Sequence, residues 1–264
     1  MQNFHSGEPV RIQKVIAQAG IASRRAAEKL ILAGEVALNG ETVREMGQKM
    51  LVGKDHLSVE GRRVKIPQRQ KTHVYALYKP KNCITTLNDP EGRTAISHFF
   101  PRTSARLFPV GRLDYDAEGL ILLTNDGDLA QQLMHPRHKV WKGYFVKVRG
   151  IVNNETLSTL RQGPVIEKRR HQPVRVKILH TVNDKTWLEI FLREGTNRQI
   201  KKMLMTLGYQ VQKIKRFQIG TVSLGELQSG ESRVLTSEEL KQIMTSSLKV
   251  VIPAKAGIRG FVII

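Results

Sequence analysis

Apolar residues near the start of the chain recur at helical spacing in two short runs. The runs cover residues 12–19 and 26–31, and each ends just before a glycine, Gly20 or Gly34. Because a glycine often terminates a helix, the pattern predicts two short helices. Ser23 is a natural N-cap for the second helix, since its hydroxyl can accept a hydrogen bond from a backbone N–H of the first turn.

A hairpin should follow these helices. Residues 35–43 read as two short strands around Asn39-Gly40, a dipeptide that tolerates the positive φ of a tight turn. We therefore expect a helix, helix, hairpin module over residues 9–64. Residues 65–73 lack apolar periodicity and contain Pro67, which predicts a linker and a domain boundary there.

The rest of the chain favours an α+β domain over residues 74–246. Apolar runs of strand length recur between short helical patterns, which fits a mixed or antiparallel sheet. The run Thr236-Ser237-Glu238-Glu239 has capping-box spacing and should open a last helix through Met244. The predicted strands cover residues 74–78, 120–124, 144–148, 174–179 and 187–192. Residues 247–264 are apolar but broken by proline and glycine, and we expect a disordered C-terminal extension.

The charge balance points to a polyanionic partner. The 264 residues contain 43 Lys and Arg against 23 Asp and Glu, a formal net charge of +20. These cations are spread over the whole chain rather than gathered on amphipathic helices, so nucleic acid is favoured over a membrane surface. No apolar run reaches the length of a membrane span, which predicts a soluble, unexported protein.

Cysteine and histidine usage argues against redox or metal chemistry. Cys83 is the single cysteine, so no internal disulfide can form, and this suits a reducing cytoplasm. The eight histidines show no spacing typical of metal ligands, and we expect no metal site. No glycine-rich nucleotide loop of the Walker type is present either.

Two arginines stand where a helix usually disfavours cations. Arg24 and Arg25 begin the second predicted helix, at the positive end of its dipole, which costs a few tenths of a kcal/mol unless an anion faces them. An RNA phosphate would reverse the sign of this interaction. The alternative is an ordinary basic surface on a small helical domain.

The order of these features is similar to a known RNA-binding module. The matching runs are Arg11-Ile12-Gln13-Lys14, Ala19-Gly20-Ile21-Ala22-Ser23-Arg24-Arg25-Ala26-Ala27-Glu28 and Val36-Ala37-Leu38-Asn39-Gly40. They resemble the α-L (S4-like) RNA-binding domain. The resemblance implies RNA contacts from Arg11, Lys14, Ser23, Arg24 and Arg25.

A charged loop that leads into a buried strand is the most informative segment for chemistry. It runs from Gly111 to Gly119, and a carboxylate at the mouth of such a strand can be partly desolvated yet reachable. Asp126 precedes a glycine and suggests a turn, while Asp128 could cap a helix over residues 129–134. Asp116 and Glu118 look like solvated loop charges. Asp114 is left, although an Arg-x-Asp loop alone is more often a surface turn.

The motifs around Asp114 resemble those of pseudouridine synthases of the RsuA/RluB group. The resemblance implies that Asp114 is the catalytic residue, and that Tyr144 stacks on the target base, although on pattern alone Tyr144 would be core. After Gln199-Ile200 the family carries an arginine that pairs with the catalytic Asp; this chain has Lys201, then Lys202, which keeps the charge but loses bidentate geometry. The motifs are Gly111-Arg112-Leu113-Asp114, the run 119–127, Tyr78-Lys79-Pro80, Leu133-Met134-His135-Pro136, the run 142–148 and the run 193–200.

The resemblance also implies the reaction and its requirements. Uridine becomes pseudouridine with no net redox change and no donated group, so no cofactor is expected. The target base must leave its stack, at a cost of a few kcal/mol. Further RNA contacts are expected from Arg112, Arg198 and Lys202, with Lys213, Lys215 and Arg216 forming a solvated basic face that could track the RNA backbone.

The form Asn197-Arg198-Gln199 looks more like the branch that acts on large-subunit (23S) ribosomal RNA. We therefore expect ribosomal RNA as the partner of a monomeric, cytoplasmic enzyme. The alternatives are a non-catalytic RNA-binding or ribosome-assembly factor on the same fold and an RNA-cleaving enzyme. The second lacks paired histidines arranged for that chemistry.

Overall fold

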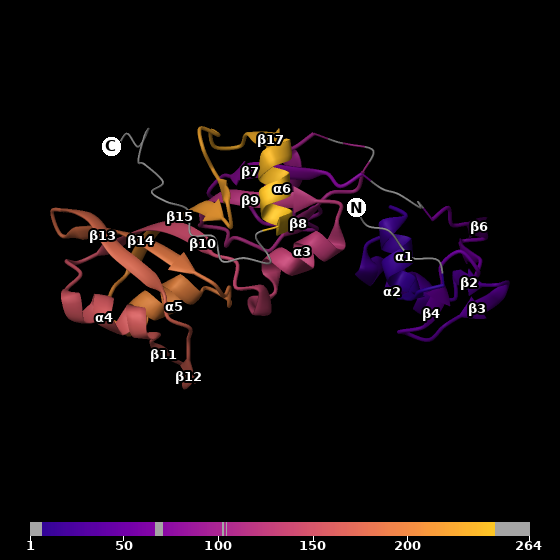
Figure 1. The fold of residues 1–264 in the computed structure, drawn as a ribbon, viewed down its shortest axis with the longest axis horizontal. Helices are drawn as coiled ribbons and strands as arrows, with labels where there is room; N and C mark the ends of the chain where they lie inside the picture. Colours follow the sequence, from indigo (N-terminus) through magenta and orange to yellow (C-terminus); the bar gives the residue numbers. More distant parts are fainter. Residues whose placement is uncertain (1–6, 67–70, 102, 104, 246–264) are drawn as a thin grey trace. The chain divides into compact units, whose positions relative to one another are not determined.

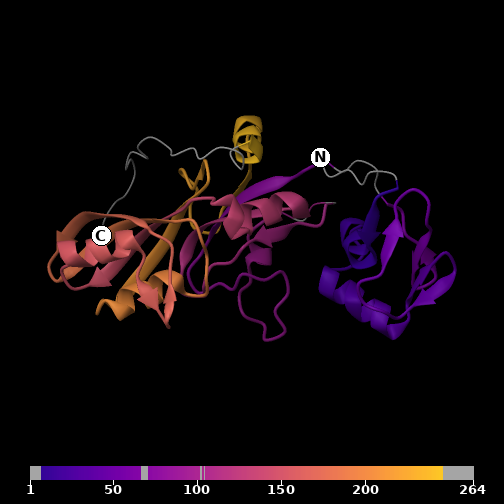
Figure 2. The same cartoon turned by 60° about the horizontal axis from the view of Figure 1, so that its bottom comes forward.

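A computed structural model describes residues 7–66, 71–101, 103 and 105–245. The chain divides into two compact units (Figures 1 and 2): the first runs to His73 and also includes Thr103–Arg106, and the rest of the chain from Val74 forms the second. Each unit has its own hydrophobic core, and the fold is α+β with a mixed sheet, as predicted. Part of the expected linker and the whole expected C-terminal extension lie outside the described residues.

The first unit contains the predicted helices and hairpin. Strand β1 pairs with β4, and a second sheet has the order β3-β2-β5-β6. Its core is built from the apolar faces of both helices and the inward residues of these strands. The elements are β1 (Pro9–Arg11), α1 (Ile12–Gln18), α2 (Arg24–Ala33), β2 (Val36–Leu38), β3 (Glu41–Val43), β4 (Lys49–Leu51), β5 (Leu57–Val59) and β6 (Arg62–Arg63).

Local signals account for the ends of these elements. The Ser23 hydroxyl accepts a hydrogen bond from Ala26 N at 3.0 Å and caps α2, while Gly34 ends that helix with a φ of 77°. Asn39 and Gly40 have φ values of 53° and 90°, which are both in the left-handed region that a two-residue hairpin turn requires. These three predictions are confirmed.

The second unit is built on one long mixed sheet with helices packed against it. Its strands are β7 (Val74–Lys79), β8 (Phe108–Val110), β9 (Glu118–Thr124), β10 (Lys142–Arg149), β11 (Val165–Ile166), β12 (Arg169–Arg170), β13 (Arg175–Val182), β14 (Lys185–Leu192), β15 (Val211–Ile219), β16 (Val222–Ser223) and β17 (Ser232–Val234). Its helices are α3 (Gly127–Met134), α4 (Asn154–Gln162), α5 (Gln199–Thr206) and α6 (Ser237–Thr245), with short 3₁₀ turns η1 (Ile96–His98) and η2 (Pro136–His138).

The sheet consists of two antiparallel halves joined by one parallel pair. The strand order is β13-β14-β10-β15-β9-β7-β17, with β16 beside β15 and β8 beside β9. Only β15 and β9 pair in parallel among the described strands, through Lys215 with Glu118 and Arg216 with Gly119. Helices α4 and α5 pack on the β13–β15 half, and α3 lies by β8 and β9 (Figure 1). The two halves therefore meet at the β9–β15 pair.

The uninterrupted apolar run of β9 follows from burial on both faces. Leu120 and Leu122 pack into the cluster that includes α3 and α6. Ile121 and Leu123 pack on the other face, with Leu77 and Ile96. A strand that is covered on both sides needs no polar alternation, and this is why the segment could be recognised from sequence.

The predictions for three acidic residues near β9 were wrong. Asp126, expected in a turn, is the N-cap of α3, and its carboxylate accepts hydrogen bonds from Asp128 N at 3.1 Å and Leu129 N at 3.0 Å. Asp128, expected as the cap, lies in the first helical turn. Glu118, expected as a solvated loop charge, begins β9 and pairs with Lys213 at 3.0 Å. The predicted capping box of α6 is confirmed by reciprocal bonds between Thr236 and Glu239.

Gly119 makes the close approach of β9 and β15 possible. Its φ is +109°, and a Cβ atom at this position would lie 2.2 Å from the carbonyl oxygen of Arg216. Backbone cannot yield as a flexible side chain can. The junction between the two halves of the sheet therefore requires glycine here.

We predict that Gly119→Ala destabilises the second unit by at least about 4 kcal/mol, because the two strands must separate. Gly225→Ala is the matched control: Gly225 also has a positive φ of 59° but open space around its Cβ position, and it should lose only about 1–2 kcal/mol. Both tryptophans, Trp141 and Trp187, lie in this unit, so their fluorescence during urea denaturation measures its unfolding. Equal losses in the two variants would contradict the argument.

Candidate active site

The loop that carries Asp114 connects β8 to β9 and is held by neighbouring residues. The Thr85 hydroxyl donates to the Leu113 carbonyl at 2.8 Å and accepts from Leu113 N at 3.2 Å. Asn82 N donates to the Tyr115 carbonyl at 2.8 Å, and Ala117 N donates to the Asp114 carbonyl at 3.1 Å. These bonds fix the backbone on both sides of Asp114.

A fully buried lysine anchors the end of this loop. Lys79, the last residue of β7, donates from Nζ to the carbonyls of Ala117 at 2.7 Å and Pro80 at 2.9 Å. Burial lowers the pKa of Lys79 to about 8, although Cys83 and acidic residues including Asp114 favour its charged form. The loop thus ends on a buried ammonium group.

Arg216 contacts the backbone before and after the loop that carries Asp114, and the prediction of its environment was wrong. It was expected on a solvated face, but it is only 5% exposed. Its Nε donates to the Leu120 carbonyl at 2.7 Å, and its Nη1 lies 3.5 Å from the Arg112 carbonyl. Nη2 has no hydrogen-bond partner among the described residues. The alternation of β15 could have predicted this burial. Arg216 lies two residues after the buried Ile214, and residues two apart share a face of a strand.

Side chains from both halves of the sheet line a cavity of about 480 Å³. Asp114, Tyr144 and Lys201, the three predicted catalytic residues, all line it. The remaining lining residues are Val110, Gly111, Arg112, Leu113, Ala117, Leu133, Met134, Lys142, Leu192, Gly195, Thr196, Asn197, Arg198, Gln199, Ile200, Ile214, Arg216 and Ile219. Asp114 is the single acidic residue of this lining.

The ion pair of Lys201 differs from the expected one. Its Nζ lies 3.8 Å from Asp114 Oδ2, but it donates to both carboxylate oxygens of Asp116 at 2.5 and 2.6 Å. Burial alone would raise the pKa of Asp116, but the hydrogen bonds and charge of Lys201 outweigh it, and the pKa is lowered. Asp116 is therefore not a free loop charge, and Lys201 serves two acids, with Asp116 the nearer.

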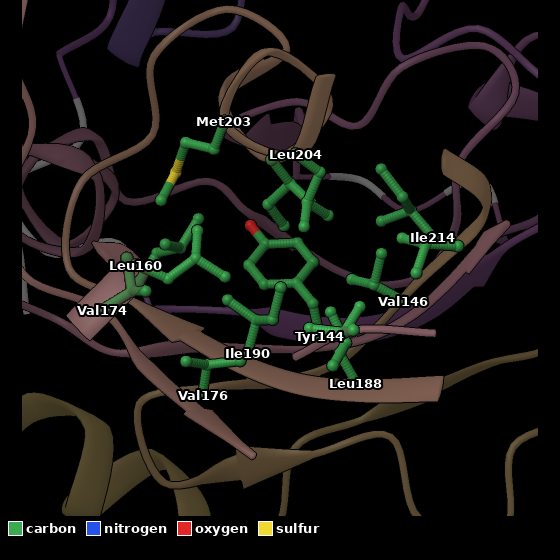
Figure 3. Close-up of a cluster of buried hydrophobic side chains, with 14 of the residues drawn as sticks. Tyr144, Val146, Leu160, Val174, Val176, Leu188, Ile190, Met203, Leu204 and Ile214 are labelled. Carbon is green, nitrogen blue, oxygen red and sulfur yellow. The ribbon is translucent and has the colours of Figure 1, made fainter. Parts of the chain in front are cut away.

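Tyr144 belongs to the hydrophobic core and to the cavity wall at once. It is 8% exposed, and its ring lies among Val146, Ile190 and Leu204 (Figure 3). It also lines the cavity near Asp114. Core packing thus holds the ring at the cavity wall, and the stacking role that the resemblance implied stays a prediction.

Buried polar residues fix the loop that precedes α5. Glu194 Oε1 accepts hydrogen bonds from Gln199 Nε2 at 2.7 Å and Gln172 N at 3.0 Å, and it lies 2.9 Å from His171 Nδ1. Thr196 N donates to Gln199 Oε1 at 3.2 Å. The sequence offered no signal for His171. This network orients the start of the helix that carries Lys201.

The cations expected to contact RNA occupy different environments. Arg112 and Arg198 are exposed at the cavity, whereas Lys202 is paired with Glu167 at 2.8 Å. In the first unit, Arg11, Arg24 and Arg25 are exposed and Lys14 is half-buried, while the Ser23 hydroxyl is used by its capping bond. Lys142 also reaches the cavity, where burial and then the charge of Arg216 lower its pKa to about 8.

The described residues contain neither a metal-binding group nor a helix that could span a membrane. No group of three or more His, Cys, Asp or Glu side chains there is arranged to hold a metal ion. None of the helices described has the length and apolar character that are needed to cross a membrane.

Fold and site together define an RNA-modifying enzyme with a separate RNA-binding module. Residues 73–206 match the family model described as RNA pseudouridylate synthase, and residues 10–55 match the S4 domain. Ribosomal large subunit pseudouridine synthase B of Bacillus subtilis is 40% identical over 235 residues, covering 88% of this chain and 95% of that protein. The chain therefore belongs to the RNA pseudouridylate synthase family.

Two further relatives agree with this assignment. An uncharacterized RNA pseudouridine synthase of Aquifex aeolicus is 41% identical over 247 residues, covering 93% of this chain and 98% of that protein. A crystal structure of a pseudouridylate synthase superposes with a TM-score of 0.64 at 30% identity, covering 89% of this chain and 99% of that one. The resemblance found in the sequence and the enzyme class that it implied are confirmed, and the non-catalytic alternative is disfavoured.

We predict that the cost of burying the Lys79 charge appears in the pH dependence of stability. Its pKa is about 8 in the folded chain and near 10.5 when exposed, so the unfolded chain binds more protons between these values. The wild-type free energy of unfolding, relative to Lys79→Met, should therefore rise with pH by up to about 1.4 kcal/mol per unit across that window. Urea denaturation followed by tryptophan fluorescence measures this difference. A constant difference from pH 8 to 10 would contradict the lowered pKa of Lys79.

Proposed function

We propose that this chain converts a uridine of large-subunit ribosomal RNA into pseudouridine, with Asp114 as the catalytic nucleophile or base. The observation that carries the proposal is that Asp114 is the only carboxylate lining a cavity that also presents Tyr144 and Lys201. The second acid of the loop, Asp116, is held by Lys201. Of the two carboxylates, Asp114 is thus the one available to a ligand.

The reaction suits a site of this composition. The bond from the sugar C1′ to uracil N1 breaks, a bond from C1′ to C5 forms, the proton on C5 leaves, and N1 gains a proton. Nothing is oxidised or reduced, so the chemistry calls for an acid–base or nucleophilic carboxylate and for no cofactor. Asp114 lies at the mouth of β9, and its side chain is 37% exposed. It can therefore act as a base or as a nucleophile on a bound nucleotide.

Tyr144 and Lys201 have supporting roles in this proposal. The Tyr144 ring, held by core packing, offers a face for the flipped base and helps to keep the freed uracil in place. The ammonium of Lys201 lies 3.8 Å from Asp114 Oδ2 and places a positive charge beside the reacting carboxylate. A cavity of about 480 Å³ is of the size that typically holds a small ligand such as a nucleoside.

RNA docking is assigned to cations in both units. Arg112 and Arg198 lie exposed at the cavity, and Lys202 beside them would contribute once released from Glu167. In the first unit we assign docking to Arg11, Lys14, Ser23, Arg24 and Arg25, consistent with the S4 match. The name of the Bacillus subtilis relative supports a large-subunit target. Because one unit lines the whole cavity, we propose a monomer, acting in the cytoplasm where bacterial ribosomal RNA is modified.

Asp114→Asn should reduce the single-turnover rate of pseudouridine formation by more than about a thousandfold, because the change is nearly isosteric and removes the reactive charge. The affinity for a large-subunit ribosomal RNA transcript should stay within about twofold, since no phosphate contact is lost. Asp116→Asn is the matched control, because it removes the same charge two residues away. Its loss should be nearer tenfold, arising through Lys201.

The comparison of these two variants separates the roles of the acids. If Asp116→Asn lost more activity than Asp114→Asn, the assignment of the catalytic carboxylate would be reversed. If both kept full activity on every ribosomal transcript tested, the proposed mechanism would be rejected.

Arg24→Gln/Arg25→Gln should weaken binding to the same transcript and flatten its salt dependence, by about 0.7–0.9 in the log–log slope for each phosphate contact removed. Helix α2 itself should become slightly more stable, because two cations leave the positive end of its dipole. Lower affinity could then not be attributed to unfolding. Arg62→Gln, at another exposed position of the first unit, is the control. An unaltered slope in the double variant would show that α2 does not meet RNA phosphates.

A further inference from the structure

One tryptophan outside the cavity is contacted by two guanidinium groups. Trp141 immediately precedes β10, Arg175 begins β13 and Arg193 follows β14. The guanidinium carbon of Arg193 lies 4.1 Å from the centroid of the Trp141 ring, and that of Arg175 lies 4.6 Å from it. We call these three residues the Arg–Trp–Arg cluster.

The cluster lies at the same end of the strands as the cavity but on the opposite face of the sheet. Lys142 and Leu192 line the cavity. Their neighbours Trp141 and Arg193 point the other way, because successive residues of a strand alternate. Arg175 pairs in register with Phe191, whose ring meets Trp141 edge-on at 6.5 Å. An RNA strand that enters the cavity could therefore pass over this end of the sheet.

The stacking leaves the guanidinium edges available for an anion. Trp141 is only 7% exposed, whereas Arg175 is exposed and Arg193 half-buried. Contact with the indole uses the flat faces of the guanidinium groups, while their N–H donors lie in the plane and can bind a phosphate bidentately. Arg193 Nε is buried and has no hydrogen-bond partner in the described part of the chain, whereas the exposed Arg175 offers its donors at the surface. The cluster thus presents oriented donors that the protein itself does not fully use.

Nearby acids do not neutralise the two arginines. Neither Arg175 nor Arg193 forms an ion pair with any described residue. Lys177, two residues along β13 and on the same face, is instead paired with Glu189 at 2.8 Å. Glu194, next to Arg193, is turned inward and occupied by the network before α5. Two like charges held against one ring repel each other, and a bound anion would relieve this repulsion.

We propose that the Arg–Trp–Arg cluster binds a backbone phosphate of the RNA, close to the nucleotide that enters the cavity. This inference rests on the proposed function, because it takes RNA as the ligand. Arginine held on a tryptophan face loses little freedom on binding, and its fork matches two phosphate oxygens. The cluster would position the RNA strand on the face of the sheet that the catalytic residues do not reach.

The test removes the two arginine charges. Its control removes Lys177, a cation on the same strand as Arg175 that is already paired with Glu189. Arg175→Met/Arg193→Met and Lys177→Met are each made in the Asp114→Asn chain, and binding to a large-subunit ribosomal RNA transcript is measured against salt. The double variant should bind about tenfold more weakly and lose about 0.7 from the log–log slope for each phosphate contact. Lys177→Met should match its parent. An unchanged slope in the double variant, or an equal change in Lys177→Met, would overturn the proposal.

Two further measurements distinguish loss of the phosphate contact from misfolding and from a failure of the proposed catalytic role of Asp114. Arg175→Lys/Arg193→Lys keeps both charges but loses the fork, so the slope should persist while affinity falls about threefold; affinity equal to that of the parent would overturn bidentate binding. With Asp114 intact, the Met double variant should keep its single-turnover rate at saturating RNA within about twofold, because the cluster does not reach the reacting atoms. Since binding is measured without catalysis, loss of the slope would support the cluster even if Asp114 proved not to be catalytic.

Discussion

The position of the loop that carries Asp114 depends on two cations that are buried against backbone carbonyls. Lys79 holds the Ala117 carbonyl, and Arg216 holds the Leu120 carbonyl and approaches that of Arg112. Burying a cation is costly unless hydrogen bonds and opposite charges compensate it. The loop supplies both, through its carbonyl oxygens and its acids. The requirement to satisfy these cations therefore fixes where Asp114 lies.

The pairing of β9 with β15 explains how the two halves of the sheet contribute residues to one cavity. Where β9 and β15 meet in parallel, Gly119 lets the backbones approach, and Arg216 donates a hydrogen bond to the Leu120 carbonyl. One half of the sheet brings Asp114 to the cavity, and the other brings Tyr144 and, through α5, Lys201. Lys201 lies between two acids and bonds the more exposed one, Asp116. The three donors of the ammonium can turn toward either acid, whereas a guanidinium holds its donors in a fixed planar fork.

Much of the fold could be predicted because its signals are local. Ser23 caps the helix that begins at the next residue, Asn39-Gly40 closes a two-residue turn, and the apolar run of β9 indicates burial on both faces. The site was harder. Asp114 was recognised by its motif rather than by physics, and the preference of Lys201 for Asp116 joins residues 85 positions apart. Asp126 and Asp128 were exchanged because a cap depends on where the helix begins, and the boundary shifted by two residues. Arg216 was missed because its charge was weighed above the alternation of its strand.

The most direct test of the catalytic assignment is a map of pseudouridines in ribosomal RNA from cells that contain or lack this gene, with each version of the chain restored in turn. The account predicts that at least one position in large-subunit ribosomal RNA stays uridine without the gene, returns to pseudouridine with the wild-type chain, and stays uridine with Asp114→Asn. Restoration by Asp114→Asn, or an unchanged map in cells without the gene, would contradict it.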